Sequence, residues 1–203
     1  MRNYLARLGW SHGDDEFFNT TQAISWFDLK GINKSPARFD FKKLDSINGK
    51  HIATLEDKDL IKNIKEFTKL NDDYDLTKLQ FSKITKALYC LKEKSKKIPD
   101  IIEKAHFLIT TRPIVRDDRA EEVLNSGGIQ LLKQLTPYLE NVNWSREGLE
   151  IAINNYLLDN NFKLGQIVQP LKAALSGKPS TPSVFDMMVL LGPDEVKDRI
   201  NDL

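Results

Sequence analysis

The stretch that decides the fold class is residues 164–177, Leu164-Gly165-Gln166-Ile167-Val168-Gln169-Pro170-Leu171-Lys172-Ala173-Ala174-Leu175-Ser176-Gly177. Its apolar residues recur at spacings of three and four, so they form one stripe along a helix. Lys172 lies about 100° from the centre of that stripe, and we expect its charge to reach solvent. Gly177 is a typical residue to end such a helix.

The same spacing continues on both sides of this stretch, and no segment alternates in the manner of a half-buried strand. We therefore predict a mainly α-helical fold with at most a small β element near residues 29–34 or 50–53. In the second half, helices are expected around residues 118–125, 129–140, 145–160, 164–176 and 183–191. In the first half, they are expected at residues 3–9, 19–27, 40–47, 54–69, 76–97 and 99–108.

Local signals place several of these helix ends. Asn19 followed by Gln22 is a capping pattern, and Asp40 is a suitable N-cap for the helix that follows it. Asn48-Gly49 is expected to end that helix. Polar residues at 71–75 and the pair Arg112-Pro113 suggest domain boundaries near residues 65 and 116.

Composition excludes some classes of protein and leaves others open. The 203 residues are 40% hydrophobic, which supports a true core, and no run approaches the roughly 20 apolar residues of a membrane span. The N-terminus mixes charged and apolar residues, unlike a secretory signal. The single cysteine, Cys90, permits no internal disulfide and fits a reducing cytoplasm.

Positive charge is concentrated in one part of the chain although the net charge is only +1. Residues 83–104 hold seven lysines against three acidic residues, so the remainder of the chain is near −3. Such a segment is either a solvated helix face or a stripe that faces phosphates. Composition alone favours the solvated face.

We find no sequence pattern that predicts catalysis or a metal site in this chain. Residues 10–16 hold a hydroxyl, His12 and three carboxylates, but neighbours on a turn usually point apart, so an exposed turn is the favoured interpretation. No glycine-rich nucleotide-binding pattern occurs. His51 and His106 have no partner at metal-ligand spacing, and Cys90 is expected to be a buried apolar residue.

Three stretches together carry a family resemblance. They are residues 2–13 (Arg-Asn-Tyr-Leu-Ala-Arg-Leu-Gly-Trp-Ser-His-Gly), residues 34–49 around Ser35-Pro36, and residues 164–192 with Thr181-Pro182-Ser183-Val184-Phe185-Asp186. In order and spacing the chain resembles the C-terminal region of bacterial glutamyl-tRNA synthetases from its first residue to its last. The resemblance implies a stem-contact domain at residues 1–65 and helical anticodon-binding domains at residues 66–116 and 117–203.

The resemblance also implies a function and its residues. The parent enzyme would be a class I aminoacyl-tRNA synthetase that joins glutamate to tRNA(Glu) with ATP and Mg²⁺, as a cytoplasmic monomer, and tRNA(Gln) stays open as a second substrate. The family's catalytic domain precedes the block where this chain begins, so Met1 is expected to be a cut or internal start, with no cofactor and no activity in the chain alone. The residues that occupy anticodon-contact positions are Lys94, Lys172, Thr181, Pro182, Val184 and Phe185.

Some positions depart from the family pattern, and two other functions stay open. Lys94 and Lys172 stand where relatives usually carry arginine, and lysine lacks the planar donor fork of guanidinium. Which tRNA is charged is therefore open. Val184 and Phe185 would equally suit core packing. The alternative functions are a helical interaction module with no RNA role and, more remotely, a small hydrolase using His12.

Overall fold

The fold comes from a computed structural model, which describes residues 1–33, 38–178 and 182–203. The Ser35-Pro36 break and the predicted site residue Thr181 lie outside the described residues. The chain divides into two compact units, which are described separately. Unit 1 comprises Met1–Asp75 and Lys92–Ile101, and unit 2 comprises Leu76–Leu91 and Ile102–Leu203.

Helices account for nearly all the regular structure. In residues 1–75 they are α1 (Arg2–Gly9), α2 (Thr20–Trp26), η1 (Leu29–Gly31), α3 (Phe41–Thr54), α4 (Asp57–Lys69) and η2 (Asp72–Tyr74). Then come α5 (Lys78–Leu91), α6 (Ile98–Lys104), α7 (His106–Ile109), α8 (Asp118–Val123), η3 (Leu124–Gly128), α9 (Ile129–Leu135), η4 (Thr136–Leu139), α10 (Arg146–Asn160), α11 (Leu164–Ser176), α12 (Val184–Leu191) and α13 (Pro193–Asn201).

The predicted fold class is confirmed. Over the described ranges the only β interaction is an isolated antiparallel bridge between Trp10 and Ile32. Ile32 lies within residues 29–34, the first of the two places where a β element was expected. The second place, residues 50–53, belongs to α3. No helix among the described residues is long and apolar enough to cross a membrane.

In unit 1 the predicted caps organise α2 and α3. The Asn19 side chain accepts a hydrogen bond from the Gln22 amide at 2.8 Å, and the Gln22 side chain accepts one from the Asn19 amide at 2.9 Å. The Asp40 carboxylate accepts hydrogen bonds from the amides of Lys42 and Lys43. The Asp40 amide in turn donates to the buried Tyr4 hydroxyl at 2.6 Å, which ties α3 to α1.

The predicted end of α3 at Asn48-Gly49 is wrong, because the helix continues to Thr54. Gly49 has a packing role instead. A Cβ atom built at Gly49 would lie 3.3 Å from the Ser95 carbonyl oxygen, so the absence of a side chain lets another segment approach the helix closely. The glycine that suggested a helix end therefore marks a contact site on the helix surface.

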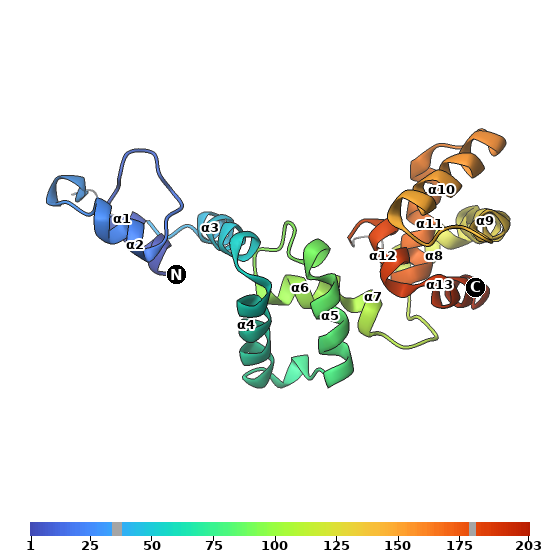
Figure 1. The fold of residues 1–203 in the computed structure, drawn as a ribbon, viewed down its shortest axis with the longest axis horizontal. Coiled ribbons are helices and arrows are strands. Elements are labelled where there is room, and N and C mark those ends of the chain that lie inside the picture. Colours follow the sequence, from blue (N-terminus) through green and yellow to red (C-terminus); the bar gives the residue numbers. More distant parts are fainter. Residues whose placement is uncertain (34–37, 179–181) are drawn as a thin grey trace. The chain divides into compact units, whose positions relative to one another are not determined.

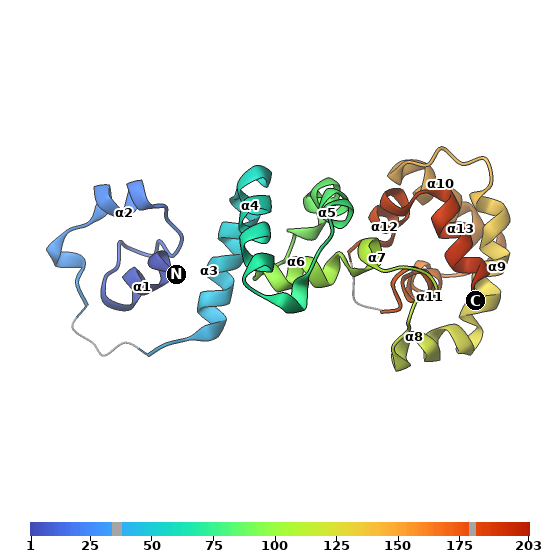
Figure 2. The ribbon, with the colours of Figure 1, turned by 90° about the horizontal axis from the view of Figure 1, so that it is seen from below.

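In unit 2 the predicted helix at residues 164–176 is confirmed and lies at the centre. Helix α11 packs against α8, α9, α12 and α13, and both views show these helices gathered around it (Figures 1 and 2). Its residues Ile167, Leu171 and Leu175 are fully buried. Helix α13 lies beyond the last predicted helix and supplies Arg199, the largest fully buried side chain.

The predicted helix at residues 76–97 is too long. Helix α5 ends at Leu91, and residues 92–97 form a turn in which Lys94 has a φ of +56°. A left-handed backbone is uncommon for a lysine and incompatible with an α-helix. Lys94 therefore lies in a loop between α5 and α6.

Candidate nucleic-acid interface

The basic loop, residues 92–97, brings four lysines into six residues. Lys94, Lys96 and Lys97 are exposed, whereas Ser95 between them is only 1% exposed. Ser95 is thus buried in unit 1, while its charged neighbours in the loop face solvent. This alternation comes from the left-handed turn at Lys94, which a continuous helix would not allow.

Contacts within unit 1 hold the basic loop in place. The Lys92 ammonium lies 2.7 Å from the Asp57 carboxylate, and the Lys97 ammonium lies 3.1 Å from that of Asp45. The Asn48 side chain donates to the Lys96 carbonyl oxygen at 2.5 Å. At the end of the loop, Asp100 accepts hydrogen bonds from the amides of Lys96 and Lys97.

These contacts fix the loop but do not engage the Lys94 ammonium. Among the described residues its side chain makes no hydrogen bond and no ion pair, and its surface is exposed. A lysine held by its backbone but unpaired at its ammonium is suited to bind an external anion or a hydrogen-bond acceptor.

The second group of predicted residues lies on α11 and at the start of α12, two helices that pack against each other. Lys172 on α11 is half-buried, so the expectation that its charge reaches solvent holds only in part, and burial lowers the pKa of its ammonium. Pro182 and Phe185 are half-buried. Val184 is only 2% exposed, so its side chain packs in the core of unit 2.

An ion pair that the sequence analysis missed positions the start of α12. The Arg146 Nη1 atom lies 2.9 Å and 3.0 Å from the two carboxylate oxygens of Asp186, and Nε lies 3.0 Å from Glu150. The Trp144 indole also donates to the Met188 carbonyl at 2.9 Å. The pair of Arg146 and Glu150 could be predicted from its spacing of four residues on one helix. The contact with Asp186 could not, because the two residues are 40 positions apart in the sequence.

The His12 cluster is assembled as an aromatic stack. His12 lies 3.2 Å from Asp15, and its ring stacks on Trp26 with the centroids 4.5 Å apart. Within the described ranges, no hydroxyl or thiol hydrogen bonds to His12. The geometry therefore offers no activated nucleophile for the hydrolase hypothesis.

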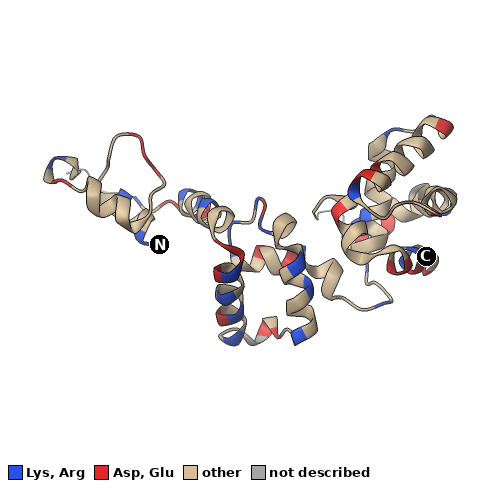
Figure 3. Ribbon diagram, viewed as in Figure 1, with Lys and Arg blue, Asp and Glu red and all other residues tan. Residues whose placement is uncertain are grey.

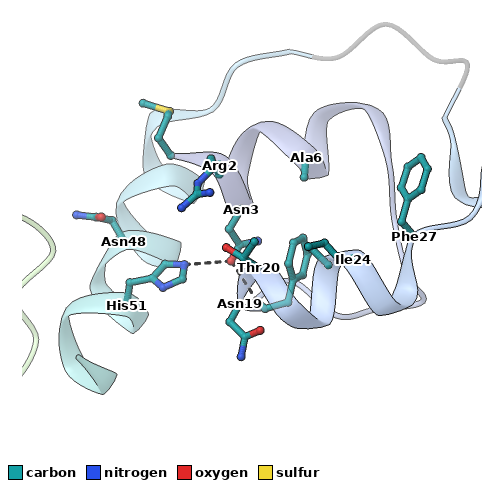
Figure 4. Close-up of a pocket in the computed structure, with 12 residues that line it drawn as sticks. Arg2, Asn3, Ala6, Asn19, Thr20, Ile24, Phe27, Asn48 and His51 are labelled. Carbon is teal, nitrogen blue, oxygen red and sulfur yellow. Dashed lines mark hydrogen bonds between the residues drawn. The ribbon is translucent and has the colours of Figure 1, made fainter. Parts of the chain in front are cut away.

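Unit 1 also carries an open groove of about 750 Å³ lined by residues of α1, α2 and α3 (Figure 4). On one side the His51 ring and the Asn3 amide oxygen point toward each other at 3.2 Å, and burial is the main cause that lowers the pKa of His51. On the other side Ile24 and Phe27 are 74% and 57% exposed. None of the predicted site residues that the structure describes lines this groove.

Comparison with known proteins identifies the family. The model of the family described as "Anticodon binding domain" matches residues 54–203, which include the basic loop, α11 and α12. The chain belongs to this family. The match contains every predicted site residue, and it confirms the anticodon-binding resemblance.

Curated relatives extend the match to the whole chain. It is 50% identical over 202 residues to glutamate–tRNA ligase 2 of Roseobacter denitrificans and 46% identical over 202 residues to glutamate–tRNA ligase 1 of Dinoroseobacter shibae. Each alignment covers 100% of this chain and 43% of the relative. The chain therefore spans less than half the length of these relatives, and it matches their C-terminal portion.

Solved structures show the same fold. The glutamate tRNA ligase of Elizabethkingia meningosepticum, solved with its amino acid, has a TM-score of 0.79 at 22% identity. The glutamate-tRNA synthetase of Elizabethkingia anophelis has a TM-score of 0.75 at 24% identity. In both cases 98% of this chain is aligned with 39% of the solved chain.

Proposed function

We propose that this chain is the tRNA-binding portion of a glutamate–tRNA ligase and that it contacts the anticodon. The observation that carries the proposal is the match of residues 54–203 to the anticodon-binding family, together with relatives of the same name along the whole chain. The alternative of an interaction module without an RNA role has no comparable support.

The geometry supports this proposal in two places. The basic loop presents Lys94, which is unpaired among the described residues, on a fixed backbone. Helix α12, which packs against the helix that carries Lys172, presents the half-buried Phe185 in its first turn. Unstacked bases are recognised by hydrogen bonds to their edges and by stacking on aromatic surfaces. The side chains that can serve these purposes are Lys94, Lys172, Pro182 and Phe185. The buried Val184 packs in the core of unit 2.

The layout and the partners complete the proposal. We assign the stem-contact role to residues 1–65 and anticodon binding to residues 66–116 and 117–203. The parent ligase joins glutamate to tRNA(Glu) in the cytoplasm as a monomer. We assign its ATP and Mg²⁺ to a part of the ligase outside the region that this chain matches, which is 43% of the relative.

A mobility-shift titration of the 203-residue chain with a tRNA(Glu) transcript tests the proposal. Binding should be detectable at low salt and should weaken steeply as salt rises, because each neutralised phosphate releases counterions. An unrelated protein of similar net charge serves as the control. Failure of the chain to bind tRNA at low salt would favour the interaction module.

We predict that Lys172→Ala and Phe185→Ala weaken tRNA binding in different ways. Loss of a phosphate contact by Lys172 should reduce the slope of log affinity against log salt by up to about one unit. Loss of a stacking ring at Phe185 should weaken the free energy of tRNA binding by roughly 1 to 3 kcal/mol, with little change in the salt slope. Both quantities come from the same salt titration.

Val184→Ala is the matched control for that pair, because Val184 is the buried neighbour of Phe185. It should lower the melting temperature and leave the affinity of the folded protein nearly unchanged. If Phe185→Ala behaves in the same way as Val184→Ala, then Phe185 is a core residue and its role in binding is refuted.

Lys94→Arg is predicted to sharpen discrimination between tRNA(Glu) and tRNA(Gln), which carry C and G at the third anticodon base. The flexible ammonium of lysine can find acceptors on G, whereas a rigid donor fork is more exacting. We expect the difference in binding free energy between the two tRNAs to change by about 1 kcal/mol. Lys96→Arg in the same loop is the control, and an unchanged ratio in Lys94→Arg would refute the prediction.

A further inference from the structure

Four lysines lie on one face of α4, in the part of unit 1 that precedes the basic loop. They are Lys58, Lys62, Lys65 and Lys69, and all four are exposed. Their spacings of four, three and four residues place them within an arc of about 60° on the helix surface. Figure 3 shows the blue segments that recur along α4. We call this group the α4 lysine stripe.

The stripe is separate from the packing surface of the helix. Leu60 and Ile64, the buried residues of α4, lie on the opposite side. From Lys58 to Lys69 the stripe extends about 17 Å along the helix axis, at 1.5 Å per residue. Of the acidic residues of α4, Asp57 is engaged by Lys92, and Asp59 and Glu66 lie to one side of the stripe.

Such a stripe is unfavourable for the helix itself. Lys58 and Lys62, and likewise Lys65 and Lys69, are like charges at i,i+4 spacing, which destabilises a helix. Among the described residues, Lys58, Lys62 and Lys69 form no ion pair with an acidic side chain. The ammonium groups of these three exposed lysines are therefore available to an external anion.

We infer that the α4 lysine stripe binds the phosphate backbone of the RNA, an inference that rests on the proposed function. A straight line of charges about 17 Å long fits a linear polyanion better than a compact anion, which would need convergent groups. The stripe carries lysines alone, without the aromatic or planar groups that read bases. It holds the RNA in position and contributes affinity that does not depend on sequence, whereas the basic loop and α12 supply base contacts.

The test compares two variants of the 203-residue chain with equal net charge. The stripe variant replaces Lys58, Lys62, Lys65 and Lys69 by Gln. The control variant replaces four other exposed lysines by Gln, namely Lys30, Lys42, Lys133 and Lys197. Salt titrations with a tRNA(Glu) transcript and with an unrelated tRNA transcript measure the phosphate contacts of each.

In the stripe variant the slope of log affinity against log salt should fall by about three units, and affinity at 0.1 M salt should fall about tenfold or more, equally for both tRNAs. The control variant should change the slope by less than about one unit. Equal slopes in the stripe and control variants would overturn this inference but would leave the proposed function standing. Absence of tRNA binding by the wild-type chain would overturn the proposed function and the inference with it.

A third variant separates a loss of charge from a loss of folding. Replacing the four stripe lysines by Arg keeps the charge and should keep the wild-type slope. Circular dichroism should show that the Gln variant keeps its helix content, because removal of like-charge pairs does not destabilise a helix. If the Arg variant loses the slope as well, the stripe acts through the fold of α4 and the inference is wrong.

Discussion

Arg199→Met is expected to lower the free energy of unfolding by about 3 kcal/mol or more. The Arg199 guanidinium is 2% exposed and lies inside unit 2. It donates to the carbonyl oxygens of Phe107, at 2.9 Å, and Leu175, and its Nε lies 2.6 Å from Glu195. Methionine fills a similar space without donors, so both carbonyls lose this partner. Urea unfolding followed by circular dichroism measures the change.

Arg112→Met is the matched control, because Arg112 also pairs with acidic residues of α13 but does so at the surface. Its guanidinium, 37% exposed, lies 2.8 Å from Asp198 and 3.7 Å from Glu195. Exposed ion pairs contribute at most about 1 kcal/mol. A loss of stability in Arg199→Met no larger than in Arg112→Met would show that the buried hydrogen bonds to the carbonyls matter little.

Gly177→Ala is expected to lower the free energy of unfolding by roughly 2 to 4 kcal/mol. Gly177 ends α11 with a φ of +70°, a conformation that costs energy for residues with a Cβ atom. A Cβ at this position would lie 2.1 Å from the Val115 carbonyl oxygen, so the backbone must move. The Gly177 carbonyl also accepts a hydrogen bond from the Asp117 amide at 3.0 Å. Thermal and urea unfolding measure the change.

Gly165→Ala on the same helix is the control for Gly177→Ala. Gly165 has ordinary helical geometry, and a Cβ there would meet no atom within 4 Å. Alanine favours the helix over glycine by up to about 1 kcal/mol, so this variant should be as stable as the wild type or more so. If both variants are equally stable, the close approach of Val115 does not restrict residue 177.

Several elements could be predicted from the sequence because their signals are local. The apolar spacing of residues 164–176 and Gly177 after it predict α11 with its exact bounds. Asn19 with Gln22, and Asp40, predict the starts of α2 and α3, since a cap connects residues only two or three positions apart. The family resemblance, spread over the whole chain, indicated the tRNA-binding role that the family match supports.

Other features depended on contacts between distant residues. Propensity predicts that the lysine-rich segment after Leu91 continues as a helix, but ion pairs to Asp45 and Asp57 and the hydrogen bond from Asn48 hold it as the basic loop. Asn48-Gly49 has the pattern of a helix end, but α3 continues past it. Gly49 instead permits the close approach of the Ser95 backbone.

The candidate site shows the same division. Sequence determined that Lys172, Val184 and Phe185 lie at helical positions, but only the tertiary structure separated the buried Val184 from the half-buried Phe185. Likewise, the sequence spacing alone places the lysines of α4 on one face of the helix, but only the tertiary structure shows that this face is exposed to solvent. The physical reason is that periodicity and caps act over three or four residues, whereas burial and ion pairing depend on segments about 40 or more positions away, whose approach no local pattern encodes.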